Sequence, residues 1–285
     1  DVTFLVRAAR QKHLQDKGLR IESLYGDYAS PVKTLTTAEG CAPYDLILLS
    51  CKAYDLENAL DSLAPAVGPH TMILPILNGL SHLDRLNERF GAKHVLGGVA
   101  KIAATLTEDG VIKHLNDWRF LIVGEQDGEL TPRVLALKAL LDKTSILATA
   151  SPHIMQAMWE KLVHLSTIAG MTCCMRASVG EIARTSEGAV LMNAFLKTNA
   201  RIAACEGFRP SDAFMAEYQA ILSDPQSSYT ASMLRDLERK GPIEGDHIIG
   251  FMYEKAKQHG LDAAMHQMIL VHLHSYEQRR AAGRL

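Results

Sequence analysis

Lys161 lies on the apolar face of a predicted helix, within the stretch MWEKLVHLSTIAG. At 3.6 residues per turn, that face also carries Ile154, Met158, Leu165 and Ile168. A lysine is rarely fully buried without a partner. Lys161 therefore either extends its ammonium group past these apolar neighbours into water, or serves chemistry in a cleft. The second interpretation makes it a candidate general acid, because partial burial brings the pKa of a lysine towards the working pH.

Three polar residues follow strand-like apolar segments in the first half of the chain, namely Arg7, Lys52 and Asn78. Ligands of an open α/β sheet bind at the carboxyl ends of its strands. Arg7 stands where a dinucleotide-binding fold places the residue that faces the adenosine ribose. A guanidinium group there suits a 2′-phosphate and indicates NADP, although a solvated start of a helix is the alternative. Asn78 either holds a nicotinamide or a substrate hydroxyl, or simply forms an Asn-Gly turn.

The glycine-rich phosphate loop G-x-G-x-x-G is absent from the sequence. In a dinucleotide-binding fold these glycines precede the position of Arg7 by about 20 residues. Only six residues precede Arg7 here. We therefore expect the first strand, the glycine-rich loop and the first helix to lie upstream of Asp1.

The rest of the chain predicts two kinds of domain. Strand and helix patterns alternate up to residue 149, which indicates a Rossmann-type, doubly wound α/β sheet whose first strand is absent here. Within it, YDLILLS (44–50) is predicted to be a parallel strand buried on both faces. Helical patterns dominate residues 150–285, starting from a predicted N-cap at Ser151. Further helices are predicted over 187–206, 211–222, 228–239, 246–259 and 262–280.

Composition excludes several classes of protein. A net charge of −2 gives no nucleic-acid footprint, and no apolar segment is long enough to span a membrane. Five cysteines without a C-x-x-C pair fit neither a disulfide framework nor a zinc ribbon, so we expect a cytoplasmic protein without a metal site. A helical second domain can bury a dimer interface, which is compatible with a homodimer.

Several motifs together resemble the ketopantoate reductase (2-dehydropantoate 2-reductase) family of pantothenate biosynthesis. They are CKAYD, LPILNGL, DGVIKH, WEKL and SSYTASMLRDLERKGPIEGDHIIG, and they occur in order between residue 45 and about residue 250. The resemblance implies an NADP-binding domain over 1–149 and a helical substrate and catalytic domain over 150–285. The implied activity is the NADPH-dependent reduction of a 2-oxo acid to the 2-hydroxy acid.

The resemblance also implies roles for individual residues. Lys161 looks like the general acid that protonates the ketone oxygen. Glu244 looks like its carboxylate partner, which also approaches the cofactor, although an acid near the start of a helix is favourable in any protein. Asn78 looks like the amide that touches both cofactor and substrate.

Four further positions correspond to binding residues of the family. Arg7 and Lys52 look like the residues near the adenosine 2′-phosphate. Ala104 falls where the family makes a backbone contact to NADP, and Ser232 looks like the contact to the substrate carboxylate.

The chain departs from the family pattern at three positions. Leu165, Ala169 and Val179 stand where the family has asparagines, of which those at 165 and 169 bind the substrate hydroxyl. A hydroxylated substrate would lose its hydrogen-bond partners there, so the sequence predicts a more apolar 2-oxo acid or another ketone. The alternative is a non-catalytic, NADP-binding sensor or regulatory protein with the same fold.

Overall fold

The computed structural model describes all 285 residues, and the chain forms two compact units. The first unit comprises Asp1–Cys51, Asp55–Ile76 and Leu86–Ile154. The second comprises Met155–Leu285 together with two short segments from the first half of the chain, Lys52–Tyr54 and Leu77–Arg85. These two segments carry Lys52 and Asn78, so two of the predicted site residues belong to the helical unit.

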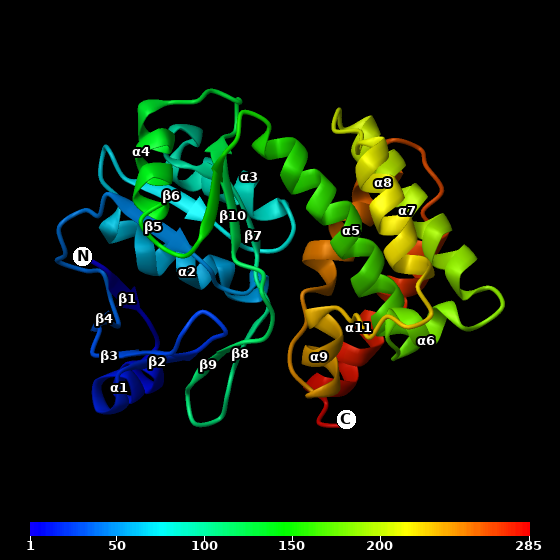
Figure 1. Cartoon of the computed structure of the whole chain (residues 1–285), viewed down its shortest axis with the longest axis horizontal. Coiled ribbons are helices and arrows are strands. Elements are labelled where there is room, and N and C mark those ends of the chain that lie inside the picture. Colours follow the sequence, from blue (N-terminus) through cyan, green and yellow to red (C-terminus); the bar gives the residue numbers. More distant parts are fainter. The chain divides into compact units, whose positions relative to one another are not determined.

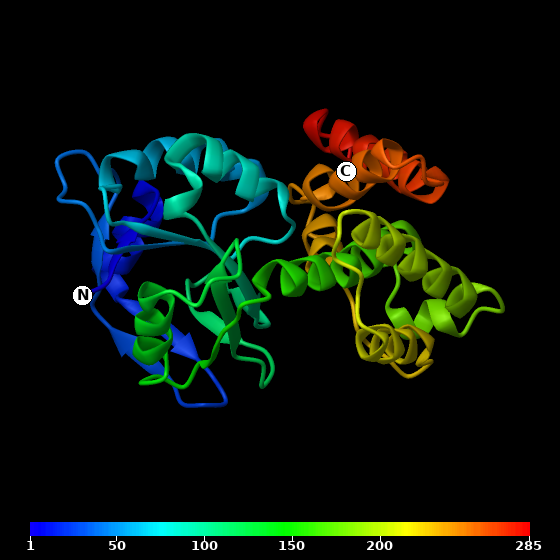
Figure 2. The same ribbon diagram turned by 90° about the horizontal axis from the view of Figure 1, so that it is seen from above.

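The first unit contains a central sheet with helices on both sides. Its strands β5 (Leu46–Leu49) and β6 (Met72–Pro75) are parallel, and an Ile73–Val95 bridge leads to β7 (Leu96–Lys101). Strand β10 (Phe120–Glu125) pairs antiparallel with β7 and parallel with β11 (Leu147–Ala150). Helix α2 (Leu56–Leu63) lies on one side of these strands and α4 (Pro132–Leu141) on the other (Figure 2). The unit is therefore the predicted α/β domain.

Shorter strands form the remainder of this unit (Figure 1). Strands β1 (Thr3–Leu5) and β4 (Lys33–Leu35) form a parallel pair beside α1 (Ala8–Lys17). A second sheet has the order β3-β2-β9-β8, with bounds Tyr28–Ser30, Leu19–Glu22, Ile112–His114 and Ala104–Leu106. Helix α3 (Ser81–Phe90) and single 3-10 turns at Ala53–Asp55, Ala64–Ala66 and Ala92–His94 complete the secondary structure of the first half of the chain.

The prediction for residues 44–50 was wrong about burial. Strand β5 forms there, but Leu48 is 54% exposed and only Leu49 is buried. The reason is that β5 hydrogen-bonds to β6 alone, so it is an edge strand in this structure. By contrast, Ile73 and Leu74 of β6 are almost fully buried.

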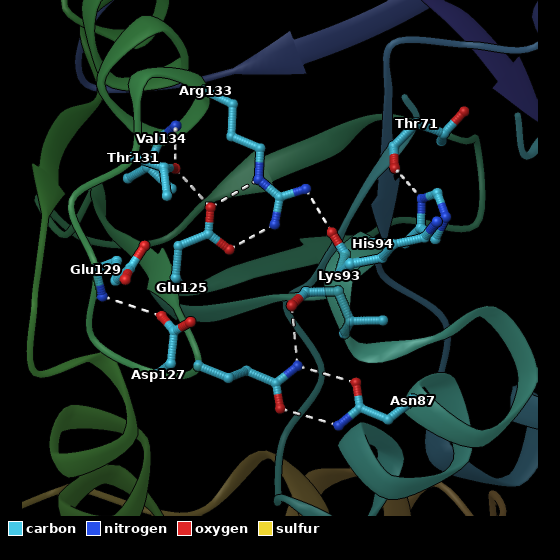
Figure 3. A network of polar contacts seen from close by, with 12 residues as sticks. Thr71, Asn87, Lys93, His94, Glu125, Asp127, Glu129, Thr131, Arg133 and Val134 are labelled. Atoms are coloured by element: carbon cyan, nitrogen blue, oxygen red, sulfur yellow. Dashed lines mark hydrogen bonds and ion pairs between the residues drawn. The ribbon is translucent and has the colours of Figure 1, made fainter. Parts of the chain in front are cut away.

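A buried polar network joins β10 to the start of α4 (Figure 3). The Glu125 carboxylate, 6% exposed, accepts two hydrogen bonds from Arg133 at 2.6 and 2.5 Å and one from Thr131 at 2.6 Å. Burial raises the pKa of Glu125, but these hydrogen bonds outweigh it and hold that pKa below its usual range. Beside them, Gln126 and Asn87 exchange amide hydrogen bonds of 3.0 Å.

The second unit is helical, as predicted. Its helices are α5 (Ile154–Met175), α6 (Val179–Ala183), α7 (Gly188–Cys205), α8 (Asp212–Ser223), α9 (Ser232–Glu238), α10 (Phe251–Gln258) and α11 (Ala264–Ala281). A π-helical turn, Asp246–Gly250, leads into α10. None of the helices has the length and apolarity needed to cross a membrane.

The long helix α5 begins three residues after the predicted N-cap at Ser151. The helix begins at Ile154, and the Ser151 hydroxyl accepts a hydrogen bond of 3.0 Å from the His153 N–H within the preceding turn. A serine hydroxyl that accepts the N–H two residues later makes the bond of a helix cap, so Ser151 has the predicted type of contact within the turn that leads into α5.

A buried amide fixes α5 against its neighbours. Asn199 of α7 donates to Thr167 of α5 at 3.0 Å and lies 2.8 Å from the Nε2 atom of His266 of α11. All three side chains are fully buried. Because buried polar groups need partners, this network sets the rotation of α5 and therefore the face on which Lys161 lies.

Candidate active site

Lys161 is half-buried on α5, and the same face of the helix carries the buried residues Ile154, Met158 and Ile168. The prediction that it lies on an apolar stripe is therefore met. Its ammonium group is close enough to His82 for its charge to help lower the pKa of that histidine. Lys161 and His82 belong to the same unit.

Glu244 is a buried carboxylate that is held at both oxygens. Only 5% of the residue is exposed. Its Oε1 atom accepts a 3.0 Å hydrogen bond from the Ala53 N–H, and its Oε2 atom lies 3.6 Å from the Lys52 ammonium nitrogen. An isolated buried carboxylate would be strongly unfavourable, and these two partners offset that cost.

Lys52 is shared between two carboxylates. Besides Glu244, it donates a 2.8 Å hydrogen bond to Asp236 of α9. Burial lowers the pKa of Lys52, but Asp236 and Glu244 outweigh it and raise that pKa above its usual range, so the lysine stays charged. Sequence reasoning placed Lys52 at a phosphate and missed Asp236. Asp236 nevertheless lies inside the SMLRDL run that carries the family resemblance.

A pair of histidines lies beside these charges. His247, in the π-helical turn, is 2.7 Å from the Ser81 hydroxyl and 3.5 Å from His82, and the two imidazole rings are stacked with 5.6 Å between their centroids. Burial, the neighbouring His247 and the charge of Lys161 lower the pKa of His82 to about 3. Burial also lowers the pKa of His247, although Glu244 and the Asn78 backbone oppose it. Both histidines are therefore neutral near pH 7.

The turn after β6 is shaped to admit His247. Gly79 has φ +84°, and a Cβ atom there would lie 2.6 Å from the Cδ2 atom of His247. The Asn78-Gly79 pair is thus the turn that one of the two interpretations predicted, and the half-buried Asn78 side chain is presented from it. Sequence reasoning missed His82 and His247, because nothing in a histidine's local sequence shows that a second one packs on it.

A cavity of about 360 Å³ opens beside Glu244. It is lined by Ala53, Tyr54, Ser81, Glu244, His247 and His274, among others. Its size falls within the usual range for a small-molecule site. Its wall contains carboxylate, hydroxyl and neutral imidazole groups. These groups can accept hydrogen bonds from the hydroxyl groups of a ligand, and the hydroxyl and imidazole groups can also donate to them.

The remaining predicted residues of the helical unit differ in accessibility. Ser232 is the first residue of α9 and is half-buried, as is Leu165. Ala169 and Val179 have no exposed surface. A contact between Ala169 and a substrate would therefore require the surrounding helices to move.

Arg7 and Ala104 lie in the α/β unit. Arg7 precedes α1, and its guanidinium forms a 2.5 Å ion pair with Asp55, a residue that sequence reasoning missed. The Arg7 side chain is nevertheless 76% exposed. Ala104 begins β8, opposite His114 of β9, and is exposed.

Two family models match the chain. The model described as "Ketopantoate reductase PanE/ApbA" matches residues 1–128, and "Ketopantoate reductase PanE/ApbA C terminal" matches residues 153–277. Together they span both units.

Similar proteins come from several bacteria. The chain is 30% identical over 280 residues to the "Uncharacterized oxidoreductase YkpB" of Bacillus subtilis, covering 98% of this chain and 92% of that protein. It is 27% identical to a 2-dehydropantoate 2-reductase of Mesorhizobium japonicum, covering 89% of this chain and 83% of the relative. Among solved structures, the 2-dehydropantoate 2-reductase of Geobacter metallireducens superposes with a TM-score of 0.88 at 25% identity, covering 96% of this chain and 91% of that chain.

Proposed function

Because the chain belongs to the ketopantoate reductase family, we propose that it is an oxidoreductase that reduces a 2-oxo acid to the 2-hydroxy acid with NADPH. The observation that carries this proposal is the half-buried Lys161 in the same unit as a buried, ion-paired Glu244. A desolvated site with one donor and one fixed carboxylate is suited to proton transfer.

The residues present fit a nicotinamide dinucleotide. The cavity beside Glu244 offers acceptors for ribose hydroxyl groups, and the exposed Arg7 guanidinium can face a phosphate. The backbone at Ala104, on the exposed edge of β8, remains the predicted further contact. A bound reduced nicotinamide supplies the hydride.

Lys161 is proposed to act as the general acid. Negative charge develops on the substrate's carbonyl oxygen as the hydride reaches the carbonyl carbon. The Lys161 ammonium stabilises that charge and donates its proton to the oxygen. Glu244, held by the Ala53 N–H and the Lys52 ammonium, is proposed to be the carboxylate partner of this lysine.

Substrate binding is proposed to involve Asn78 and Ser232. Asn78 would hold the carbonyl side of the substrate and the cofactor, and Ser232 would bind the substrate carboxylate. Leu165 offers an apolar surface where an asparagine would hold a hydroxyl group, so we propose that the preferred substrate is more apolar than ketopantoate.

The test of the acid is Lys161→Ala. We expect turnover to fall by about 10²–10⁴-fold while the Kd for NADPH stays unchanged, because a positioned acid contributes a factor of that size to the rate. The assay follows NADPH oxidation with ketopantoate and a panel of apolar, branched and aromatic 2-oxo acids. Lys161→Arg should also be inactive, because arginine keeps the charge and does not release its proton.

The matched control is Lys197→Ala on the exposed face of α7. Full turnover by Lys161→Ala would rule out the general-acid role. NADPH binding without turnover of any substrate in the panel would favour the sensor, a second candidate that the three missing asparagines support.

A further inference from the structure

Both cations that were predicted to bind the 2′-phosphate are already paired with carboxylates. Lys52 is shared between Asp236 and Glu244, and Arg7 forms its ion pair with Asp55. The second pair is the more informative, because it lies where the fold places the residue that recognises the adenosine ribose.

Asp55 is directed at Arg7 rather than at its own helix. It occupies the N-cap position of α2, where an aspartate would ordinarily accept a hydrogen bond from the first turn. No such bond is present, and its Oδ1 atom lies 2.5 Å from the Arg7 guanidinium across 48 residues of sequence. Arg7 is 76% exposed and Asp55 27% exposed, so both groups can be reached by a ligand.

A carboxylate in this position opposes a 2′-phosphate and suits a free ribose. It competes with the phosphate for the guanidinium, and it repels the phosphate's negative charge. It can also accept a hydrogen bond from a ribose 2′-hydroxyl, which is how acidic residues of dinucleotide-binding folds recognise NAD.

We propose that Asp55 is a residue that determines cofactor specificity. Arg7 favours the binding of NADPH, and Asp55 weakens it, so that the protein accepts NADH as well as NADPH. This inference rests on the proposed function, because it assumes that a nicotinamide dinucleotide binds here.

The test is Asp55→Asn in the full chain, with Kd measured for NADPH and NADH by cofactor fluorescence. Asparagine keeps the preference for the N-cap position and removes the charge. We expect the Kd for NADPH to fall by about tenfold, as loss of one like-charge contact implies, and the Kd for NADH to stay the same or rise. Arg7→Ala should weaken NADPH by a similar factor and leave NADH nearly unchanged.

Asp61→Asn is the matched control, because Asp61 lies in α2 itself and forms an exposed ion pair, 3.1 Å from Arg89. For Asp61→Asn, the ratio of the Kd for NADPH to the Kd for NADH should equal that of the wild type. The inference is overturned if Asp55→Asn binds both cofactors with the wild-type ratio. Failure of the wild type to bind either cofactor would instead overturn the proposed function, so the two failures are distinguishable.

Discussion

A few hydrogen bonds and ion pairs hold the side chains of Glu244 and Lys52 in place in a partly apolar site. Glu244 is buried, and the Ala53 N–H and the Lys52 ammonium each occupy one of its oxygens. Lys52 is in turn fixed by Asp236. Removing one partner would leave a buried or half-buried polar group with only one of its two contacts, which is destabilising.

His82 provides a prediction at the residue scale. Its pKa is lowered from 6.5 to about 3, so the folded chain holds it neutral. Its contribution to stability is therefore fully present above pH 6.5. As the pH falls from 6.5 towards 3, the unfolded chain binds a proton that the folded chain does not, and that stability is lost.

Urea unfolding of the wild type and His82→Gln should reveal this loss. The stability of the wild type relative to the variant should fall by about 2 kcal/mol between about pH 7 and about pH 5, because one such histidine contributes about 1.4 kcal/mol per pH unit below its unfolded pKa. His70→Gln, at an exposed histidine, is the control for the substitution itself. A pH-independent difference for His82→Gln would mean that His82 titrates normally in the folded protein.

At the scale of elements, the turn between β6 and α3 sets the position of both Asn78 and His247. Gly79 allows the chain to reverse with a positive φ and lets His247 pack against the backbone. Helix α5 carries Lys161, and the turn carries Asn78. Both residues belong to one unit although they come from different halves of the sequence.

Gly79→Ala should separate backbone strain from steric clash. Any alanine at this φ is strained, and here its Cβ would also lie 2.6 Å from His247. We expect a loss of about 1 kcal/mol from the backbone and a further loss of about 1–3 kcal/mol from overpacking. Chemical denaturation measures the sum.

Gly91→Ala is the matched control, because Gly91 has nearly the same φ, +86°, and nothing within 4 Å of an added Cβ. It should show only the backbone loss. Equal destabilisation of the two variants would show that His247 moves aside freely, and that the turn does not fix it.

At the scale of the whole molecule, the helical unit is not formed by the C-terminal half of the chain alone. Lys52–Tyr54 and Leu77–Arg85 belong to it, and they supply partners to Glu244 and His247. A fragment of residues 150–285 contains every helix from α5 onwards but lacks these partners.

The effect of Glu244→Gln on stability should therefore differ between the whole chain and a fragment of it. In the whole chain, Glu244→Gln should cost about 1–3 kcal/mol, because it removes a charged partner from Lys52 and Ala53. In the fragment of residues 150–285, the same change should be neutral or stabilising, since the carboxylate has lost both partners. Thermal melts followed by circular dichroism measure both.

The exposed Glu217 of α8 is the control, and Glu217→Gln should have little effect on either form. An equal loss on Glu244→Gln in the fragment and in the whole chain would contradict this prediction. It would show that the helices alone hold Glu244 in place.

Local patterns in the sequence were enough to predict the class of fold and to single out Lys161 as a candidate for chemistry. Hydrophobic periodicity and spacing were sufficient for the α/β unit, for the helical unit and for Lys161 on an apolar face. These patterns extend over a few residues, and the geometry of a helix or strand alone decides which of those residues share a face. The family resemblance added Glu244, Asn78 and Ser232 as candidates.

The interaction partners of the site residues became visible only in the tertiary structure. The two residues of each contact lie far apart in the sequence. The separation is 184 residues between Lys52 and Asp236, 165 between His82 and His247, and 48 between Arg7 and Asp55. The tertiary structure also decided that Leu48 is exposed, because β5 is an edge strand. Such pairings follow from how sheets and helices pack, which no local pattern records. They contribute to the raised pKa of Lys52 and the lowered pKa of His82.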